Sequence, residues 1–212
     1  MMTATRLYLS RHGQVANHHE QRYNGHFDVD ITALGVEQME RLAIALSAEK
    51  ITGVYSSDLK RAAKGATMIS NALGLKSKKE RELRELHLGR WEGLTREEAV
   101  RLYPEDAGFS FRDLGKDKVT GGESLIELRA RVMPAVTALL KAHEKERVFI
   151  MAHGGVNRVI LCDAMGLALE NFFHIEQDYG CLNVIDYFQD GTKVVKLLNG
   201  GPNQALEATR LY

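Results

Sequence analysis

The chain has 212 residues, of which 44% are hydrophobic and 26% are charged, as is ordinary for a globular protein. Its 28 basic residues balance 28 acidic ones, so no global field attracts the chain to nucleic acid or to an anionic membrane. It contains two cysteines without CxxC spacing, no apolar span of about 18 residues and no signal-peptide pattern, so we expect a cytoplasmic protein.

The first predicted strand ends in a group of polar residues. Residues 7–9 form a short apolar run that leads directly into Arg11, His12 and Gly13. Ligands of open α/β sheets bind at the carboxyl ends of the strands. An arginine offers a charged fork for a phosphate, a histidine is a nucleophile near neutral pH, and a glycine lets an anion approach the backbone. This short motif therefore marks a candidate anion site.

A helix, a strand and a second helix follow. Apolar residues at helical spacing predict a helix over residues 32–50, and an apolar run predicts a strand over residues 51–55. A further amphipathic stretch predicts a helix over residues 59–73, with Ser57 or Asp58 as its N-cap. This alternation is typical of a mostly parallel sheet with helices on its faces.

The middle of the chain lacks this alternation. Residues 76–90 are dense in charge, a capping box stands at residues 95–98, and residues 104–120 show no convincing period. We therefore predict an insertion at about 80–120 that packs over the sheet edge and is no independent domain. Trp91 is interpreted as a packing residue.

The last third returns to regular elements. They are a long helix from Ser124 or Thr120 to about residue 140, a buried strand over residues 147–152, a helix over residues 156–165, and a hairpin over residues 183–188 and 193–198. The tail beyond residue 200 is predicted to be loosely attached.

Four segments place polar residues at the end of a predicted strand or the start of a helix. They are residues 11–13, 57–61, 84–85 and 153–154. If the strands are parallel neighbours, these segments converge on one crevice that holds two arginines, two histidines and a carboxylic acid. Such groups suit phosphoryl transfer through a phosphohistidine, because arginines neutralise the oxygens, an imidazole attacks and a carboxylic acid protonates the leaving oxygen.

The motifs RHG, SSDLKRA, LRELHLGRWEG, GGES and AHGG occur in this order, and together they resemble the histidine phosphatase superfamily, which is phosphoglycerate mutase-like. The resemblance spans roughly residues 5–190 and implies an α/β fold, a three-layer α/β/α sandwich with a mostly parallel central sheet. With the insertion, we expect a single domain over residues 1–212. The resemblance implies neither a metal nor another cofactor.

The resemblance also implies catalytic roles. His12 would be the phosphorylated nucleophile, and Glu85 the general acid that later acts as the base for water. Arg11, Arg61 and His153 would hold the phosphoryl group, with His153 counted among the catalytic residues. The two guanidinium groups beside His12 favour its neutral form, because they lower its pKa.

Further contacts with phosphate or substrate are implied for Gly13, Asn17, Asn24, Gly25 and Gly154. The family usually has an asparagine seven residues after the arginine of RHG. In this chain that position is His18, and Asn17 lies one residue earlier. Either the loop is shorter by one residue or Asn17 has lost the role, and both interpretations stay open.

Other histidines receive a structural interpretation. His18, His19 and His26 resemble a metal cluster at first, but no carboxylate or cysteine stands near them at ligand spacing, so they are interpreted as solvent-exposed. His87 is interpreted as a structural or rim residue.

The leading hypothesis is a phosphomonoesterase that hydrolyses a small phosphorylated metabolite. The alternative is a cofactor-dependent phosphoglycerate mutase, which is disfavoured because the insertion lacks the paired arginines of that branch. The WEG sequence and the compact insertion resemble ribazole-phosphate phosphatases and broad-specificity phosphatases. A second alternative is an inactive phosphate-binding module, which would be expected to lack His12 or Glu85. We expect no nucleic-acid or membrane partner, and a homodimer stays open.

Overall fold

The computed structural model describes residues 4–111, 115 and 117–201 of the chain. The strands are β1 (Thr5–Arg11), β2 (Ile51–Ser56), β3 (Ser77–Lys79), β4 (Arg147–Ala152), β5 (Leu182–Tyr187) and β6 (Lys193–Gly200). The α-helices are α1 (Ala33–Leu46), α2 (Lys60–Ala72), α3 (Arg96–Leu102), α4 (Leu125–Ala142) and α5 (Gly154–Met165). Short 3-10 helices are η1 (Arg81–Leu83), η2 (Gly89–Trp91), η3 (Pro104–Asp106) and η5 (Leu169–His174). The predicted tail lies outside the described residues, except for Gly201.

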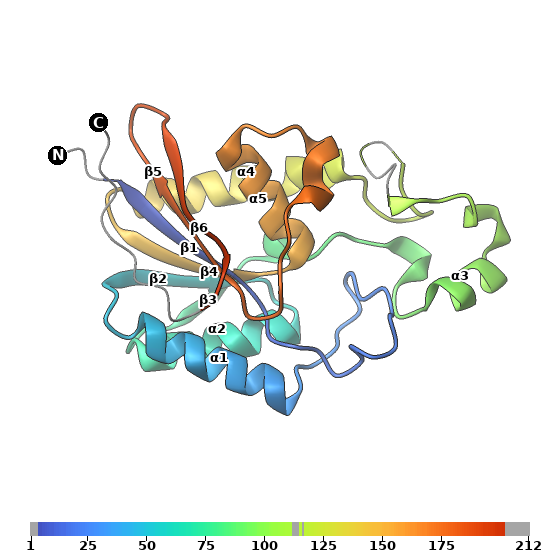
Figure 1. Cartoon of the computed structure of the whole chain (residues 1–212), viewed down its shortest axis with the longest axis horizontal. Helices are drawn as coiled ribbons and strands as arrows, with labels where there is room; N and C mark the ends of the chain where they lie inside the picture. Colours follow the sequence, from blue (N-terminus) through green and yellow to red (C-terminus); the bar gives the residue numbers. More distant parts are fainter. Residues whose placement is uncertain (1–3, 112–114, 116, 202–212) are drawn as a thin grey trace.

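The six strands form one mixed sheet in the order β3-β2-β4-β1-β5-β6 (Figure 1). The neighbours β3, β2, β4 and β1 run parallel, whereas β5 pairs antiparallel with β1 and β6 pairs antiparallel with β5. In the register of β1 and β4, Arg11 lies opposite Ala152. The residues that follow these partners, His12 and His153, therefore leave the sheet side by side.

Alternating side chains of the central strands pack against helices on both faces of the sheet. Leu7 and Leu9 of β1 belong to the hydrophobic core under α4 and α5, whereas Tyr8 belongs to the core under α1 and α2. Figure 1 shows these two helix pairs on opposite sides of the strands. The predicted three-layer sandwich with a mostly parallel sheet is confirmed.

One local prediction is wrong, and one strand was not predicted. Neither Ser57 nor Asp58 caps α2, because Leu59 occupies the N-cap position and makes no side-chain cap bond. Instead, the Oδ1 atom of Asp28, distant in sequence, accepts the backbone N–H of Lys60 at 2.7 Å. The charge-dense segment after residue 76 also contains the edge strand β3, which the sequence pattern did not indicate.

Between β3 and α4 the chain leaves the sheet and forms short helices. The predicted capping box of α3 is present, with Thr95 and Glu98 exchanging side-chain and backbone bonds. Ser124, and not Thr120, caps α4 in the same way. Trp91 is completely buried in the core with α4 and α5, as expected of a packing residue. This segment thus covers the carboxyl edge of the sheet with an apolar layer.

Candidate active site

A cavity of about 240 Å³ opens at the carboxyl edge of the parallel strands. The residues that line it include every expected cation, the expected nucleophile and the expected acid. They are Arg11, His12, Arg22, Tyr23, Asn24, Gly25, Arg61, Glu85, Leu86, Leu88, Phe111, Gly155, Arg158, Phe172, Phe173 and Tyr179. Residues of three of the four predicted segments, 11–13, 57–61 and 84–85, therefore line one cavity, and Gly155 of its wall directly follows the fourth.

The ring of His12 is held in a defined tautomer. Its Nδ1 atom lies 2.8 Å from the carbonyl oxygen of Gly13, which can only accept, so Nδ1 carries the proton and Nε2 keeps a free lone pair. Burial, followed by the charges of Arg61 and Arg11, holds the pKa of His12 well below its usual range. A neutral imidazole with a free Nε2 is the form that a nucleophile needs.

His153 lies beside this ring, with the two ring centroids 5.1 Å apart. Its Nε2 atom makes a 2.7 Å hydrogen bond with the hydroxyl of Ser57. Its buried Nδ1 atom has no hydrogen-bond partner among the described residues. Burial, followed by Arg61, lowers the pKa of His153 well below its usual range, so the ring is neutral. If Ser57 donates to Nε2, Nδ1 carries the proton and can donate it to an anion.

Two guanidinium groups, that of the buried Arg61 and that of the half-buried Arg11, complete an anion site around His12. Arg61 is 1% exposed and donates to the carbonyl oxygens of Phe27 at 2.9 Å and Gly25 at 2.6 Å. Arg11 donates from Nη1 to the carbonyl oxygen of Gln177 at 2.5 Å, while its Nε atom has no partner among the described residues. Because buried polar groups normally make hydrogen bonds, these fixed donors suit a phosphoryl group.

The carboxylate of Glu85 is fixed at the amino end of α5. The backbone N–H of Gly155 lies 3.1 Å from each carboxylate oxygen, and Oε1 also accepts the N–H of Leu86 at 2.9 Å. A Cβ atom on Gly155 would lie 2.3 Å from Oε1, so this contact requires glycine. The group can exchange a proton with a substrate oxygen in the cavity.

The loop after His12 contains three further residues that were expected to contact phosphate or substrate: Asn17, Asn24 and Gly25. Asn17 and Asn24 exchange amide hydrogen bonds at 2.7 and 3.1 Å, which connects Asn17 to the cavity wall. His18, by contrast, bonds through Nδ1 to the carbonyl oxygen of Val15. Asn17, and not His18, is therefore the residue joined to the site. Gly25 contributes its backbone to the wall and has φ +44°, which favours glycine.

The two glycines that follow His12 and His153 serve different purposes. A Cβ atom on Gly13 would lie 2.4 Å from the carbonyl oxygen of Gly35, so Gly13 permits close packing of the backbone against the start of α1. This packing contact with Gly35 explains the glycine without the expected approach of an anion, which stays a prediction. A Cβ atom on Gly154 would instead lie 3.2 Å from Nη1 of Arg158 and 3.7 Å from Nε of Arg11, inside the cationic site.

Several residues of the site were missed by the sequence analysis. Arg158 lies one helical turn after Gly154 on α5, a spacing that could have indicated it. Its guanidinium carbon lies 5.6 Å from the ring centroid of Phe172 and 6.0 Å from that of Phe173. The guanidinium of Arg11 lies 4.0 Å from the ring centroid of Tyr179. No periodicity in the sequence marks these aromatic residues as lining a cavity.

The histidines outside the site differ in environment. His19 is exposed, but His18 and His26 are half-buried, so the expectation that all three are exposed is wrong for two of them. Nε2 of His26 lies 2.9 Å from the carbonyl oxygen of Glu85. His26 thereby connects the loop after Asn24 to the segment that carries the acid.

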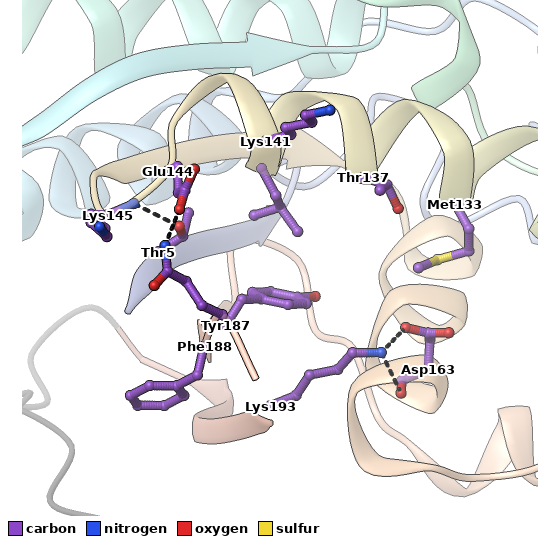
Figure 2. A pocket seen from close by; sticks show the side chains of 12 residues that line it. Thr5, Met133, Thr137, Lys141, Glu144, Lys145, Asp163, Tyr187, Phe188 and Lys193 are labelled. Atoms are coloured by element: carbon purple, nitrogen blue, oxygen red, sulfur yellow. Dashed lines mark hydrogen bonds and ion pairs between the residues drawn. The ribbon is translucent and has the colours of Figure 1, made fainter. Parts of the chain in front are cut away.

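A second cavity, of about 580 Å³, lies between α4, the amino end of β1 and the β5–β6 hairpin (Figure 2). In it, Nζ of Lys193 pairs with a carboxylate oxygen of Asp163 at 2.7 Å, and Thr5 accepts the N–H of Lys145 at 2.9 Å. The described residues that line it include neither histidine nor arginine. The groups suited to phosphoryl transfer therefore lie in the smaller cavity, at the opposite end of β1.

Comparisons with known proteins agree with this arrangement. The sequence matches the family model of the histidine phosphatase superfamily (branch 1) over residues 7–200. Phosphoserine phosphatase 1 of Hydrogenobacter thermophilus is 31% identical over 192 residues, which cover 91% of each chain. Phosphoglycerate mutase-like protein 4 of Arabidopsis thaliana is 41% identical over 155 residues, which cover 72% of this chain and 67% of that protein.

Solved structures show the same fold over nearly the whole chain. The α-ribazole phosphatase from Shigella flexneri has a TM-score of 0.87 and 26% identity, and the match covers 96% of this chain and 100% of that one. A mycobacterial glucosyl-3-phosphoglycerate phosphatase, in complex with VO3, has a TM-score of 0.83 and 27% identity over 93% of this chain and 100% of its own. Within the described residues, no helix has both the length and the apolar character needed to cross a bilayer. The chain belongs to the histidine phosphatase superfamily.

Proposed function

We propose that this protein is a phosphatase that hydrolyses a small phosphate monoester through a phosphohistidine on His12. One observation carries the proposal. The neutral ring of His12 is tied through Nδ1 to Gly13 and keeps Nε2 free, in a cavity that also holds Arg11, Arg61 and Glu85. This combination supplies a nucleophile, fixed positive charge for the phosphoryl oxygens and a proton donor for the leaving group.

The reaction has two balanced steps. Nε2 of His12 attacks phosphorus, the bond from phosphorus to the ester oxygen breaks, and the carboxyl group of Glu85 gives its proton to that oxygen. A water molecule then attacks the phosphohistidine while Glu85 takes one of its protons, and the phosphorus–nitrogen bond breaks. Inorganic phosphate leaves, and both residues return to their initial states. Arg11, Arg61 and His153 stabilise the phosphoryl group in both steps.

The lining of the cavity supports a small organic leaving group. Besides the cations, His12, Asn24 and Glu85, the wall contains apolar and aromatic side chains, among them Tyr23, Phe111 and Phe173. The relatives named above act, by their names, on phosphoserine, on α-ribazole phosphate and on glucosyl-3-phosphoglycerate. We therefore propose a phosphorylated small metabolite as the substrate.

The test is phosphate release from an aryl phosphate by the wild-type protein and by the His12→Ala variant. Activity is expected in the wild type alone. With a leaving group that departs without protonation, the Glu85→Gln variant is expected to accumulate phosphate on residue 12 that is labile in acid and stable in base. Phosphate release that survives His12→Ala, or a Glu85→Gln variant without this phosphorylated residue, would contradict the scheme.

A metabolite screen that includes ribazole phosphate and 3-phosphoglycerate separates hydrolysis from mutase activity. A phosphatase transfers the phosphoryl group to water and releases inorganic phosphate. A mutase returns it to a hydroxyl group and yields an isomeric phosphate ester. Isomerisation of phosphoglycerate at a rate above that of phosphate release would contradict the phosphatase assignment.

A further inference from the structure

Two histidines and a glutamate come together on the outer side of the active-site wall. His26 follows the loop that contains Asn24, whereas His87 and Glu92 flank the 3-10 helix η2. One potential ligand atom from each of these three residues lies within 4.8 Å of those from the other two. Among the described residues, no other group of three or more His, Cys, Asp or Glu side chains comes this close. Two imidazoles and one carboxylate form a donor set typical of zinc and related transition metals.

Both imidazole rings are oriented by backbone carbonyl groups. Nδ1 of His87 lies 2.9 Å from the carbonyl oxygen of Gly121, so it carries the proton and Nε2 keeps its lone pair. Nε2 of His26 lies 2.9 Å from the carbonyl oxygen of Glu85, so Nδ1 keeps the lone pair in that ring. Metal-binding histidines almost always donate their second ring N–H to such an oxygen, which fixes the tautomer. Each ring therefore has one nitrogen free to bind a cation.

The carboxylate of Glu92 is held in place and retains capacity for a metal. Its Oε1 atom accepts the backbone N–H groups of His26 at 2.7 Å and Leu88 at 3.1 Å, and it lies 3.5 Å from Nε2 of His87. A carboxylate offers about four lone-pair sites, so these two backbone bonds do not exhaust it. Zinc bonds of about 2.0–2.2 Å need the ligand atoms roughly 3.5 Å apart, so a bound ion requires the side chains to move inward by about 1 Å.

The surroundings give a cation access without strong repulsion. His26 and His87 line an open hollow of about 390 Å³. Three arginines, Arg81, Arg84 and Arg131, line this hollow together with the carboxylates of Glu82 and Glu123. Two of these arginines are paired, because Arg84 makes two 2.6 Å bonds with Asp58 and Arg131 makes a 2.7 Å ion pair with Glu123. Solvent can thus supply the remaining ligands of the ion.

We propose that His26, His87 and Glu92 form a binding site for a divalent transition-metal ion of the zinc class. The ion connects the loop after Asn24 to the segment of residues 85–92, two parts of the active-site wall that are far apart in the chain. It lies outside the phosphoryl site and takes no part in the reaction. Its expected effect is to stabilise the folded protein, since only the folded chain brings the three ligands together.

The test is titration of the metal-free full-length protein with Co²⁺ alone, followed by displacement with Zn²⁺. One bound ion per chain is expected, with the visible absorption of low-coordinate cobalt, and the thermal midpoint is expected to rise with the Zn²⁺ concentration. His87→Gln is expected to weaken binding by more than about 100-fold, because loss of a second-shell partner alone costs about 10–100-fold. Glu92→Gln serves as a second variant and is compared with the wild type by circular dichroism in the absence of metal.

The matched control is His18→Gln combined with His19→Gln. The centroids of these two rings lie 3.5 Å apart with the ring planes tilted by 44°, and neither residue is a member of the cluster of His26, His87 and Glu92. The control variant is expected to bind one Co²⁺ with the affinity of the wild type. The proposal is overturned if the wild type shows no cobalt spectrum, if His87→Gln binds as tightly as the wild type, or if the spectrum is lost with His18 and His19.

Discussion

The backbone N–H of Gly155 lies 3.1 Å from both carboxylate oxygens of Glu85, so the proposed general acid is positioned by the first turn of a helix. The positive end of the helix dipole favours a carboxylate at this place. Because the neighbouring Gly154 begins α5 directly after His153, one chain segment sets the positions of both the acid and the second histidine. A change in the backbone at Gly155 should therefore impair proton transfer by Glu85 more than it impairs phosphate binding.

Gly155→Ala tests this positioning. The added Cβ would lie 2.3 Å from Oε1 of Glu85 and would displace the carboxylate. We expect kcat to fall by about 10²–10⁴-fold for substrates with poor leaving groups, and by much less for an aryl phosphate whose leaving group needs no proton. Steady-state rates over a series of leaving groups measure the difference.

Gly154→Ala is the control for that series. Its Cβ would meet Nη1 of Arg158 at 3.2 Å, the mobile end of a long side chain, so the cost should be smaller and should depend little on the leaving group. Equal losses in the two variants, or a Gly155→Ala loss independent of the leaving group, would show that Glu85 is not positioned in this way.

The hydroxyl of Ser57 offers a second prediction. If Ser57 donates the 2.7 Å hydrogen bond to Nε2 of His153, it selects the tautomer in which Nδ1 can donate to the phosphoryl group of the proposed reaction. Ser57→Ala should lower kcat/KM by about tenfold, the equivalent of one hydrogen bond, and Ser57→Thr should restore part of it.

The neighbouring Ser56 provides a matched control for this change. Its buried hydroxyl has no hydrogen-bond partner among the described residues, so Ser56→Ala removes the same atom without breaking such a bond. The rate should stay near that of the wild type. If the two alanine variants lose activity equally, the hydrogen bond of Ser57 has no role in setting the tautomer or orientation of the His153 ring.

The low pKa values of the two active-site histidines predict a dependence of stability on pH. Burial is the main cause for both, followed by the charge of Arg61. In the unfolded chain the pKa of each ring is about 6.5, whereas in the folded protein the pKa is lower, so both rings stay neutral well below pH 6.5. The stability contribution is therefore fully present above pH 6.5 and is lost progressively as the pH falls below it.

Urea unfolding between pH 8 and 5 measures this effect. His12→Gln and His153→Gln cannot take up a proton at residue 12 or 153, so each should reduce the number of protons taken up on unfolding by up to about one. Above pH 7 the pH slopes of both variants should match that of the wild type. An unchanged slope below pH 6.5 would show that the folded protein protonates these rings normally.

The parts of the site that could be predicted lie at the ends of strands. After the half-buried Arg147, the run VFIMA is apolar and buried in the sheet, and its end places His153 beside His12 through the parallel register of β1 and β4. Local pattern and the rules for parallel sheets suffice here, because both histidines follow their strands immediately. The same reasoning brought Arg61 and Glu85 to this edge.

Contacts that depend on tertiary packing could not be predicted. Ser57 was one of two predicted helix caps, with Asp58 as the other, but in the structure it bonds to His153, and Asp28 accepts the N–H of Lys60 at the start of α2. The aromatic pair Phe172–Phe173 has no periodic pattern and reaches the cavity only because η5 packs on α5. Residue type and spacing do not contain this information.

The aromatic wall of the cavity should select among substrates. Phe173 lines the cavity, is 48% exposed, and packs against Phe111 with the ring centroids 6.4 Å apart. An aryl or other apolar leaving group can bury surface on these rings, whereas a small polar alcohol cannot. Phe173→Ala should therefore raise KM for an aryl phosphate by about tenfold and change KM for glycerol phosphate little, since about 1.4 kcal/mol of ring contact is lost.

The control is Leu102→Ala, which removes an apolar side chain of similar exposure, 54%, from α3. Leu102 is not among the described residues that line the cavity, so both KM values should stay unchanged. An effect of Phe173→Ala that is equal for the two substrates would mean that the ring supports the cavity structurally. An effect confined to the aryl ester would mean that the ring contacts the leaving group, because only that substrate carries an apolar surface for it to cover.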